Sequence, residues 1–448
     1  MDVFLASDCS CKMCATGISW GMDNFRRAAV FCSAVLFAST LAAQVKTGQA
    51  AFENAVDEKP GNRIHITLAD VPAPHPDETV ANGPQLVPRN GAIPIAKPGY
   101  RVELYAEGGF KIPRLIRTAP NGDLFLADSG AGSVIVLRGV GANGRAAQRE
   151  VFATGLNKPF GINFWPADNP QYVYVANTDS VVRFPYKNGD LKATGAAETV
   201  VSGIPAGGGH WTRDVVFSKD GQRMFVSVGS GSNVDDPDTH PAEKNRADVL
   251  EYKPDGTFVK VYAYGIRNCV GEAIQPETGE LWCSVNERDL LGNHLVPDYI
   301  THVQEGGFYG WPWWYMGGKQ DPRHAGKHPE LQAKVITPDV LMQPHNGSLQ
   351  MTFYEGKGLP GVAKGDIFAA EHGSWNRKER TGYEVVHVPV RNGKAMGEYE
   401  DFLTGFTTPD GKVWGRPVGI TVAKDSAIIV VEDGANTVWR VTWVGKQN

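Results

Sequence analysis

The chain has 448 residues and is rich in Gly (52), Pro (29) and Trp (11) but poor in Met (8) and Cys (6). This length allows a large core, and this composition favours many short strands joined by tight turns over packed helices. The formal net charge of -5 argues against nucleic acid as the main partner, because nucleic-acid-binding proteins usually carry a basic excess.

The N-terminus has the pattern of a targeting segment. Arg26 and Arg27 precede the apolar run "AAVFCSAVLFASTLAA", which ends in small residues. The run is shorter than the roughly 20 residues that a membrane-spanning helix needs. We therefore predict a signal segment over residues 1–43, with the true start at Met22 and a mature chain from near Gln44. This predicts a periplasmic or secreted protein with no transmembrane span in the mature chain.

Residues 44–98 are rich in Pro and Asn, as in "DVPAPHPDETVANGPQLVPRNGAIP". Little hydrophobic periodicity is present there. This composition predicts an extended leader that lies over the domain surface or is partly disordered.

Internal repeats dominate the rest of the chain. Five copies of the order strand, Gly-marked loop, apolar strand, turn, apolar strand, polar loop start at Val102, Glu150, Glu198, Val259 and Tyr399, and a more degenerate sixth copy starts at Pro344. Repeats of roughly 45 to 80 residues made of short strands are typical of a β-propeller. The sequence predicts an all-β, six-bladed β-propeller over residues 99–446. The N-terminal strand near 102–106 lacks a blade of its own and is expected to close the last blade, beside "TVWRVTW".

Basic residues recur at one position of the repeats. The loop before the innermost strand should lie at one mouth of the central channel, and it holds Lys111, Arg114, Lys158, His210, Arg213, Arg267, His345 and Arg416. Isolated Lys and Arg side chains are usually solvated loop charges. Their recurrence in an acidic chain predicts a site for a polyanion, in which Arg114, Lys158 and Arg213 are candidate ligands. The three glycines before His210 would let backbone and ligand approach closely.

A second set of loops on the same side is polar and partly acidic. It includes "GSGSN", "NERD" (286–289), "EHGSWNR" (371–377) and Glu432–Asp433. Oxygen-rich loops of this kind can hold Ca²⁺, although turns alone also enrich these residue types.

The two cysteines of the predicted mature chain, Cys269 and Cys283, flank a hairpin turn at "PETG". If Gln275 faces Glu280, strict alternation sends the two side chains to opposite faces of the sheet. Two thiols are therefore favoured over a disulfide unless a β-bulge intervenes. No haem-attachment motif is found after the signal segment.

Four stretches together carry a resemblance to a known family. "GGGHWTRDVVF", "AYGIRNCVGEAIQPETGELWCSVNERD", "AAEHGSWNR" and "GRPVGI" resemble the sorbosone and pyranose dehydrogenase branch of soluble quinoproteins, related to soluble aldose dehydrogenase. The resemblance covers about residues 100–445. It implies a six-bladed propeller that binds pyrroloquinoline quinone (PQQ) and Ca²⁺ at the channel mouth and oxidises the anomeric or aldehyde carbon of a sugar. PQQ is a planar tricarboxylate, the kind of polyanion that the basic loops predict. A separate electron acceptor, a cytochrome or the quinone pool, is also implied.

The resemblance also implies roles for particular residues. His210 matches the catalytic base, Arg267 and Asn268 match the pair that contacts the quinone oxygens and a carboxylate, and Arg416 matches a carboxylate-binding arginine. Further cofactor contacts are expected from His372, Asn376 and Arg377. The calcium loop of the family corresponds to Glu287, Arg288 and Asp289, where the ligands are largely main-chain carbonyls.

The chain departs from the glucose enzymes at two places. Gly229 and Ser230 stand near the position of an expected Asp, and Arg288–Asp289 replaces a Gly-Pro calcium loop. Glucose is therefore not implied as the substrate, nor is an exact metal geometry.

Two alternatives belong to other classes of protein. One is a gluconolactonase-like, metal-dependent lactone hydrolase, which the basic residues at the innermost slots disfavour. The other is a non-catalytic sugar-binding propeller that uses the aromatic stretch "GGFYGWPWWY" (306–315). The sequence leaves open which sugar is used, the electron acceptor and the oligomeric state.

Overall fold

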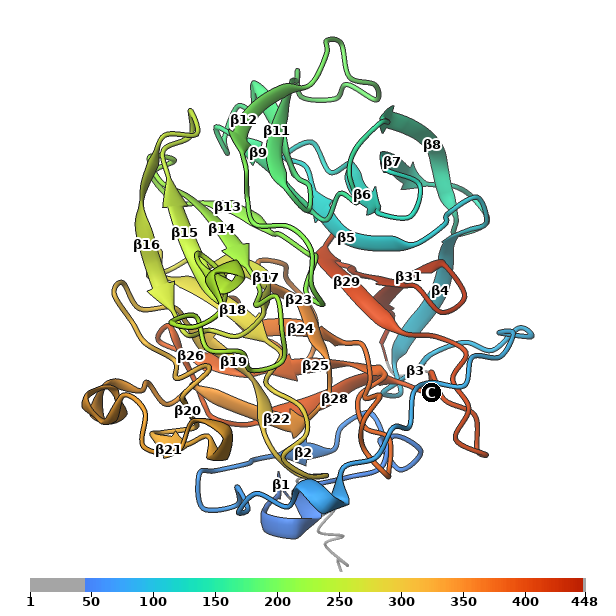
Figure 1. Ribbon diagram of the computed structural model, residues 1–448. Helices are drawn as coiled ribbons and strands as arrows, with labels where there is room; N and C mark the ends of the chain where they lie inside the picture. Colours follow the sequence, from blue (N-terminus) through green and yellow to red (C-terminus); the bar gives the residue numbers. More distant parts are fainter. Residues whose placement is uncertain (1–44, 446–448) are drawn as a thin grey trace, which may run out of the picture. The chain divides into compact units, whose positions relative to one another are not determined.

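The computed structural model describes residues 45–445, which form strands, turns and loops with very little helix (Figure 1). The helical segments are short 3₁₀ turns: η1 (Gly48–Ala51), η2 (Pro76–Glu78), η3 (Pro241–Glu243), η4 (Pro322–His324) and η5 (Pro329–Lys334). Among residues 45–445 no helix is long and apolar enough to cross a membrane. The predicted signal segment 1–43 and the proposed start at Met22 lie outside the described residues.

Five antiparallel sheets of four strands each follow the predicted repeats. The first sheet contains β5 (Pro113–Thr118), β6 (Leu124–Asp128), β7 (Ser133–Val140) and β8 (Ala146–Ala153). The second contains β9 (Gly161–Trp165), β10 (Tyr172–Ala176), β11 (Ser180–Pro185) and β12 (Glu198–Ser202). The third contains β13 (Val215–Phe217), β14 (Met224–Val228), β15 (Asp248–Tyr252) and β16 (Phe258–Tyr264). The others are β17 (Cys269–Ile274), β18 (Leu281–Val285), β19 (Pro297–His302) and β22 (Val340–Pro344), then β29 (Pro417–Val422), β30 (Ile428–Glu432), β31 (Thr437–Trp443) and β4 (Tyr100–Glu107). The arrangement is that of an all-β propeller.

The sixth repeat forms the core of a seven-stranded sheet. Its strands β23 (Ser348–Phe353), β24 (Ile367–Glu371), β25 (Glu384–Val388) and β28 (Tyr399–Thr404) are extended by the short strands β1 (Val45–Lys46), β2 (Arg63–Ile64) and β3 (Ile95–Ala96). Two small hairpins, β20 (Trp314–Tyr315) with β21 (Lys319–Gln320) and β26 (Val390–Arg391) with β27 (Lys394–Ala395), lie outside these sheets.

Burial within the sheets explains the residue types of the strands. The second strands, such as β6 with the sequence LFLAD and β18 with LWCSV, are buried along their whole length because neighbouring sheets cover both faces. The last strands, such as β8 with AAQREVFA, are largely exposed and carry charged residues, as edge strands commonly do. The core therefore lies between the sheets.

The first strands of successive sheets contact one another in the order β5, β9, β13, β17, β23, β29 and back to β5. Figure 1 places most of these strands around the middle of the view. β4, which precedes the first repeat's own strands, pairs antiparallel with β31, and Val102 lies opposite Val441.

The described part of the predicted leader packs on the seven-stranded sheet. β2 and β3 both pair with β28, and β1 pairs with β2. Glu53 and Glu58 of this segment are buried, at 8% and 6% exposure. The leader thus contributes side chains to the interior.

A disulfide joins Cys269 to Cys283, which corrects the preference for two free thiols. The pairing of β17 with β18 shifts register between Cys269 and Gly271, so that Cys269 lies opposite Val285. This β-bulge moves Cys269 by one position relative to strict alternation and brings both side chains to the same face. A β-bulge is the condition under which the sequence permits a disulfide between these two cysteines.

Candidate active site

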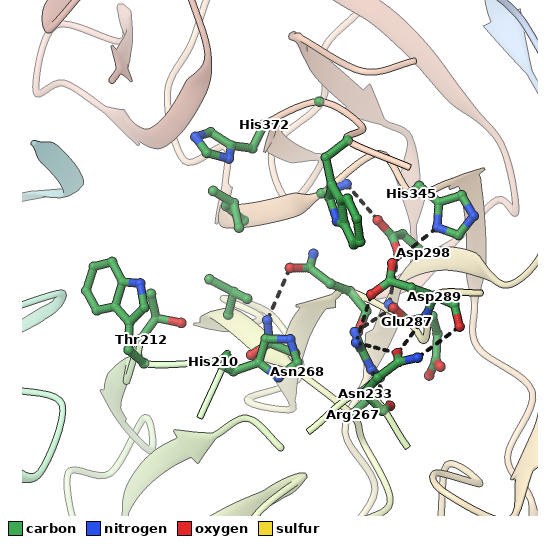
Figure 2. A pocket seen from close by; sticks show the side chains of 18 of the residues that line it. His210, Thr212, Asn233, Arg267, Asn268, Glu287, Asp289, Asp298, His345 and His372 are labelled. Carbon is green, nitrogen blue, oxygen red and sulfur yellow. Dashed lines mark hydrogen bonds and ion pairs between the residues drawn. The ribbon is translucent and has the colours of Figure 1, made fainter. Parts of the chain in front are cut away.

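A cavity of about 490 Å³ lies where loops from several sheets meet (Figure 2). Arg114 comes from the start of β5, and the loops that precede the other first strands contribute Gly209 to Thr212, Arg267 and Asn268, His345 and Gly347, and Arg416. The loops that follow the second strands contribute Gly231 to Asn233, Asn286, Glu287, Asp289, His372, Gly373 and Trp375. The volume lies in the range typical of small-molecule sites.

Eight of the thirteen predicted site residues line this cavity: Arg114, His210, Arg267, Asn268, Glu287, Asp289, His372 and Arg416. The other five, Lys158, Arg213, Arg288, Asn376 and Arg377, do not line it.

Among residues 45–445, His210 has hydrogen-bond partners at one ring nitrogen, Nδ1, and none at Nε2. Its Nδ1 lies 2.9 Å from the carbonyl oxygen of Ser230 and 3.0 Å from the Ser230 hydroxyl. Because a carbonyl can only accept, Nδ1 carries the proton and donates, which leaves a lone pair on Nε2. Burial, and then the nearby charge of Arg267, lowers the pKa of His210 to about 3. The ring is therefore neutral and able to accept a proton at neutral pH.

Gly229 explains how His210 and Asn268 come close together. A Cβ at this position would lie 2.2 Å from Oδ1 of Asn268 and 2.7 Å from Cβ of His210. Only a residue without a side chain allows this approach. The glycine that departs from the glucose-enzyme pattern thus has a packing role here.

Arg267 anchors two of the cavity's loops. Its guanidinium donates to the carbonyls of Asn233 (3.1 Å) and Glu287 (2.5 Å) and lies 3.2 Å from the carboxylate of Asp289. Figure 2 shows Arg267, Asn233, Glu287 and Asp289 gathered on one side of the cavity, away from His372. The arginine therefore connects the loop after β14 with the loop after β18.

A second charged network lies around His372. Arg416 donates to Nδ1 of His372 at 2.9 Å, so Nε2 carries the proton and donates to Asp433 at 2.8 Å. Arg114 pairs with the same carboxylate at 3.3 Å. Burial, and then the charge of Arg416, lowers the pKa of His372 to about 4, so this ring is neutral as well. Arg114 thus pairs with Asp433 directly, whereas Arg416 is linked to it through His372.

Three carboxyl groups also line the cavity, and Asp298 among them was not predicted. Burial raises the pKa of Glu287 to about 7 and that of Asp298 to about 6. Burial alone would also raise the pKa of Asp289, but contacts with His345 and Arg267 lower it to about 2. Near neutral pH the ionised carboxylate of Asp289 lies beside Arg267, and Asp433 pairs with Arg114. The guanidinium of Arg416 bonds to the neutral His372 and forms no ion pair within residues 45–445, so its positive charge favours an anionic ligand.

Arg213 and Lys158 lie elsewhere than expected. The Arg213 guanidinium is fully buried and donates to the backbone carbonyls of Pro205 (2.6 Å), Thr212 (2.6 Å) and His210 (3.1 Å). It holds the loop before β13 in shape and does not face the channel. Lys158 is exposed, and its ammonium lies 5.9 Å from the ring of Trp211.

Arg288, Arg377 and Asn376 do not line the cavity either. Arg288 forms a buried ion pair with Asp321 (Nε to Oδ2, 2.8 Å), and Arg377 donates to Gln343 at 3.0 Å. Asn376 contacts the site indirectly: its Nδ2 donates at 2.7 Å to Asp289, which lines the cavity.

The expected calcium loop does not form a metal site by itself. The carbonyl of Glu287 accepts a hydrogen bond from Arg267, and that of Asp289 accepts one from Asn233 (3.0 Å). Within residues 45–445 no group of three or more His, Cys, Asp and Glu side chains is arranged to hold a metal ion.

Comparisons with known proteins agree with this architecture. A profile of the family described as TrAA12-like matches residues 94–299 and 320–444. An uncharacterised protein of Borreliella burgdorferi is 26% identical over 359 residues, which cover 77% of this chain and 89% of that protein. A "pyrroloquinoline quinone-dependent pyranose dehydrogenase" of Coprinopsis cinerea is 25% identical over 65% of this chain, but the match spans only 44% of its length. A structure titled as the calcium structure of a Trichoderma reesei family AA12 carbohydrate-active enzyme shares the fold, with a TM-score of 0.68, 20% identity and coverage of 78% of this chain and 97% of that chain.

Proposed function

Because the chain belongs to the TrAA12-like family, we propose that it is a PQQ-dependent dehydrogenase that oxidises the anomeric or aldehyde carbon of a sugar. The observation that carries the proposal is the combination, in one cavity, of a neutral His210 with a free Nε2 and three guanidinium groups. The name of the Coprinopsis cinerea relative supports the choice of cofactor.

The residues of the cavity fit this cofactor. When bound, PQQ would supply an ortho-quinone that can accept a hydride, that is one proton with two electrons, from the substrate carbon, and three carboxylates that need cationic partners. Arg114, Asn268 and Arg416 would hold it. Arg267 would contribute its positive charge, because its N–H groups already donate to Asn233, Asn286, Glu287 and Asp289. Buried Nε of Arg114 and buried Oδ1 of Asn268 have no hydrogen-bond partner within the described part of the chain. Since buried polar atoms are nearly always satisfied, these two atoms support a ligand at this place.

His210 acts as the general base in this proposal. Nε2 takes the proton from the hydroxyl on the carbon that is oxidised, either the anomeric hydroxyl or that of a hydrated aldehyde. The Ser230 carbonyl holds the ring in the tautomer that this step requires. Because burial and Arg267 disfavour the charged imidazolium, His210 then gives the proton up to solvent readily.

Calcium enters the proposal only as an ion that binds together with the cofactor. The carbonyls of Glu287 and Asp289 already accept hydrogen bonds from Arg267 and Asn233, so the protein residues alone do not fit Ca²⁺. The calcium named in the Trichoderma reesei title and the ionised carboxylate of Asp289 support the ion. Calorimetry should find Ca²⁺ binding by the protein with PQQ and none below millimolar concentration without it. Tight binding to the cofactor-free protein would contradict this view.

The number of blades and the closure of the propeller are also part of this proposal. We take the seven-stranded sheet as the sixth blade and the pairing of β4 with β31 as the closure of a propeller domain over residues 99–446. The cyclic contacts of the first strands support this reading.

Export is proposed as well, with residues 1–43 as a signal segment, 44–98 as a leader and the periplasm or exterior as the destination. The Cys269–Cys283 disulfide supports it, because structural disulfides persist mainly in oxidising compartments. N-terminal sequencing of secreted material should begin near Gln44, and recovery of an intact Met1 from the cytosol would refute export.

One experiment tests the function directly. Purified protein is titrated with PQQ and Ca²⁺, and aldoses, sorbosone and lactones are then screened for reduction of an artificial dye. We expect a cofactor absorbance spectrum and dye reduction with at least one sugar. Hydrolysis of a lactone without dye reduction would indicate the lactonase alternative instead. In this proposal a separate electron acceptor reoxidises the cofactor, and in the assay the artificial dye takes the place of that acceptor.

A further inference from the structure

A short stretch of the leader crosses two loops that border the cavity. This stretch, residues 75–83, lies outside the part of the chain that matches the family profile. The backbone N–H of His75 donates to the carbonyl of Leu291 at 2.8 Å, on the loop that follows Asp289. Next to it, Gly292 adopts a φ of +126°, and a Cβ there would lie 2.9 Å from the carbonyl oxygen of His75. The leader therefore packs directly on this loop.

Asn82 makes three hydrogen bonds to the second loop. Its backbone N–H donates to the carbonyl of Trp375 at 2.7 Å, and its side-chain Nδ2 donates to the carbonyls of Arg377 (3.0 Å) and Lys378 (2.9 Å). A single residue thus satisfies three of the acceptors of this loop. On the opposite side the loop is held by the bond from Asn376 to Asp289.

Trp375 belongs to the part of the loop that these bonds hold, since its own carbonyl accepts from Asn82 and the next residue is Asn376. It lines the cavity, yet its relative exposure is 49%, and it is the one exposed tryptophan among residues 45–445. The apolar C–H face of a pyranose ring packs well on an aromatic face, while the sugar hydroxyls remain available to polar groups. An exposed indole at the border of a cavity that contains a general base is suited to this contact.

We propose that Trp375 is a specificity-determining residue that contacts the pyranose ring of the sugar, and that Asn82 is a positioning residue that acts through it. This inference rests on the proposed function and deepens it. It assigns to the leader, a segment outside the family match, a part in substrate selection.

Kinetics with the PQQ-loaded enzyme and an oxidised aldopyranose test the assignment. Trp375→Ala should raise KM about five- to ten-fold with kcat within about two-fold, and Trp375→Tyr should recover most of the loss. Asn82→Ala should raise KM about three-fold. Because Asn82 acts through Trp375, the double variant should be no worse than Trp375→Ala alone. Asn62→Ala is the matched control, since Asn62 lies in the same leader and its side chain donates to Glu53 and to neither cavity loop, and it should leave KM unchanged.

A binding measurement separates this inference from the proposed activity. A methyl pyranoside has no anomeric hydroxyl and cannot be oxidised there, so its Kd from ligand-observed NMR reports the contact without turnover. Trp375→Ala should weaken this Kd by about the same factor as KM. If the parent oxidises sugars but the Trp375 variants keep parental KM and Kd, this inference is wrong and the proposed function stands. If the effects of Trp375→Ala and Asn82→Ala on KM add in the double variant, Asn82 does not act through Trp375. If the parent protein oxidises no sugar, both the proposed function and this inference are wrong.

Discussion

Ser230 decides which nitrogen of His210 can act as a base. Its carbonyl holds the proton on Nδ1, so the reactive lone pair lies on Nε2. His210→Gln keeps a side chain of similar length but removes that lone pair. We expect kcat to fall at least 100-fold, in line with typical contributions of about 10² to 10⁴ from general-base catalysis. Stopped-flow dye reduction measures this, and PQQ affinity and thermal stability should stay near parental values. Turnover within a few-fold of the parent would mean that the base lies elsewhere, and His372 would then be tested next.

The pKa of His210 predicts how kcat/KM changes at acid pH. Its neutral form is the active one, and burial together with Arg267 lowers its pKa to about 3. Activity from this group should therefore persist as the pH falls from 7 to 5 and decline only as the pH approaches 3. A pH series of kcat/KM over pH 4 to 8 measures it. A decline centred near pH 6.5 would show that His210 titrates as an ordinary exposed histidine.

Arg416 is the cleanest test of cofactor capture by charge. Charge-assisted hydrogen bonds are worth roughly 1.5–3 kcal/mol, so Arg416→Ala should weaken PQQ binding by about one to two orders of magnitude. Arg267→Ala should also weaken it, but that change additionally frees the carbonyls of Asn233 and Glu287. Fluorescence titration with PQQ gives the affinities. Arg183→Ala, which removes a surface pair with Glu198, is the control and should bind as the parent does. Parental affinity in both cavity variants would contradict the argument from charge.

The sequence located the loops of the site better than the side chains within them. The repeats indicate which loops lie at the channel mouth, and His210, Arg267 and Arg416 do line one cavity. Loop side chains follow no period, however, so nothing in the pattern shows that Arg213 turns back onto its own backbone carbonyls. Asp298 was missed because it lies within β19, where a sequence pattern suggests a core position.

At the scale of elements, a single inserted residue in β17 determines the chemistry of two cysteines. Strict alternation predicted the wrong pairing state, and the bulge could not be placed without knowing which residue of β18 faces Cys269. The second strands, in contrast, were predictable, because burial on both faces requires the continuous apolar runs that the sequence shows. The leader was the least predictable element, since its strands contain only two residues each.

The disulfide gives a prediction of its own. Cys269 directly follows Asn268 of the cavity, and the bond spans a sequence separation of 14. Cys269→Ser should lower the free energy of unfolding by about 2–4 kcal/mol, the range expected for a loop of this size. Chemical denaturation of parent and variant measures the difference. The double variant Cys269→Ser, Cys283→Ser should be no less stable than the single one, and equal stability of parent and single variant would contradict a structural role.

At the scale of the whole molecule, the junction of leader and seven-stranded sheet buries several carboxyl groups together. Glu58 accepts from the Gly382 N–H, Asp401 accepts from the Lys59 N–H, and both oxygens of Glu384 lack a partner within residues 45–445. Burial, and then the proximity of Asp401, raises the pKa of Glu58 and of Glu384 well above the usual range. Burial, and then Glu53, raises the pKa of Asp401 to about 7.

These groups predict how stability depends on pH. A folded-state pKa above the unfolded value means that the folded state holds the proton more tightly, so the stabilisation is complete below about pH 4 and is lost as pH rises through 7. Carboxylates with lowered pKa, such as Asp433, act in the opposite sense at the acid end. The Tm should therefore be highest in mildly acidic buffer and fall toward pH 8. Glu384→Gln should flatten this fall in calorimetric scans. An unchanged slope in that variant would mean that the cluster does not govern it.

The pairing of β4 with β31 has a consequence for how the protein is made. β4 leaves the ribosome before β5 to β8, but its partner, residues 437–443, is synthesised more than 300 residues later. Throughout that interval β4 lacks its partner edge, and the sheet of β29 and β30 cannot be completed. Any nascent or truncated chain that ends before residue 437 therefore presents an unpaired strand, which is a substrate for chaperones and proteases. The pair can form only after residues 437–443 have been made, so closure of this sheet is one of the last steps in the folding of a newly synthesised chain.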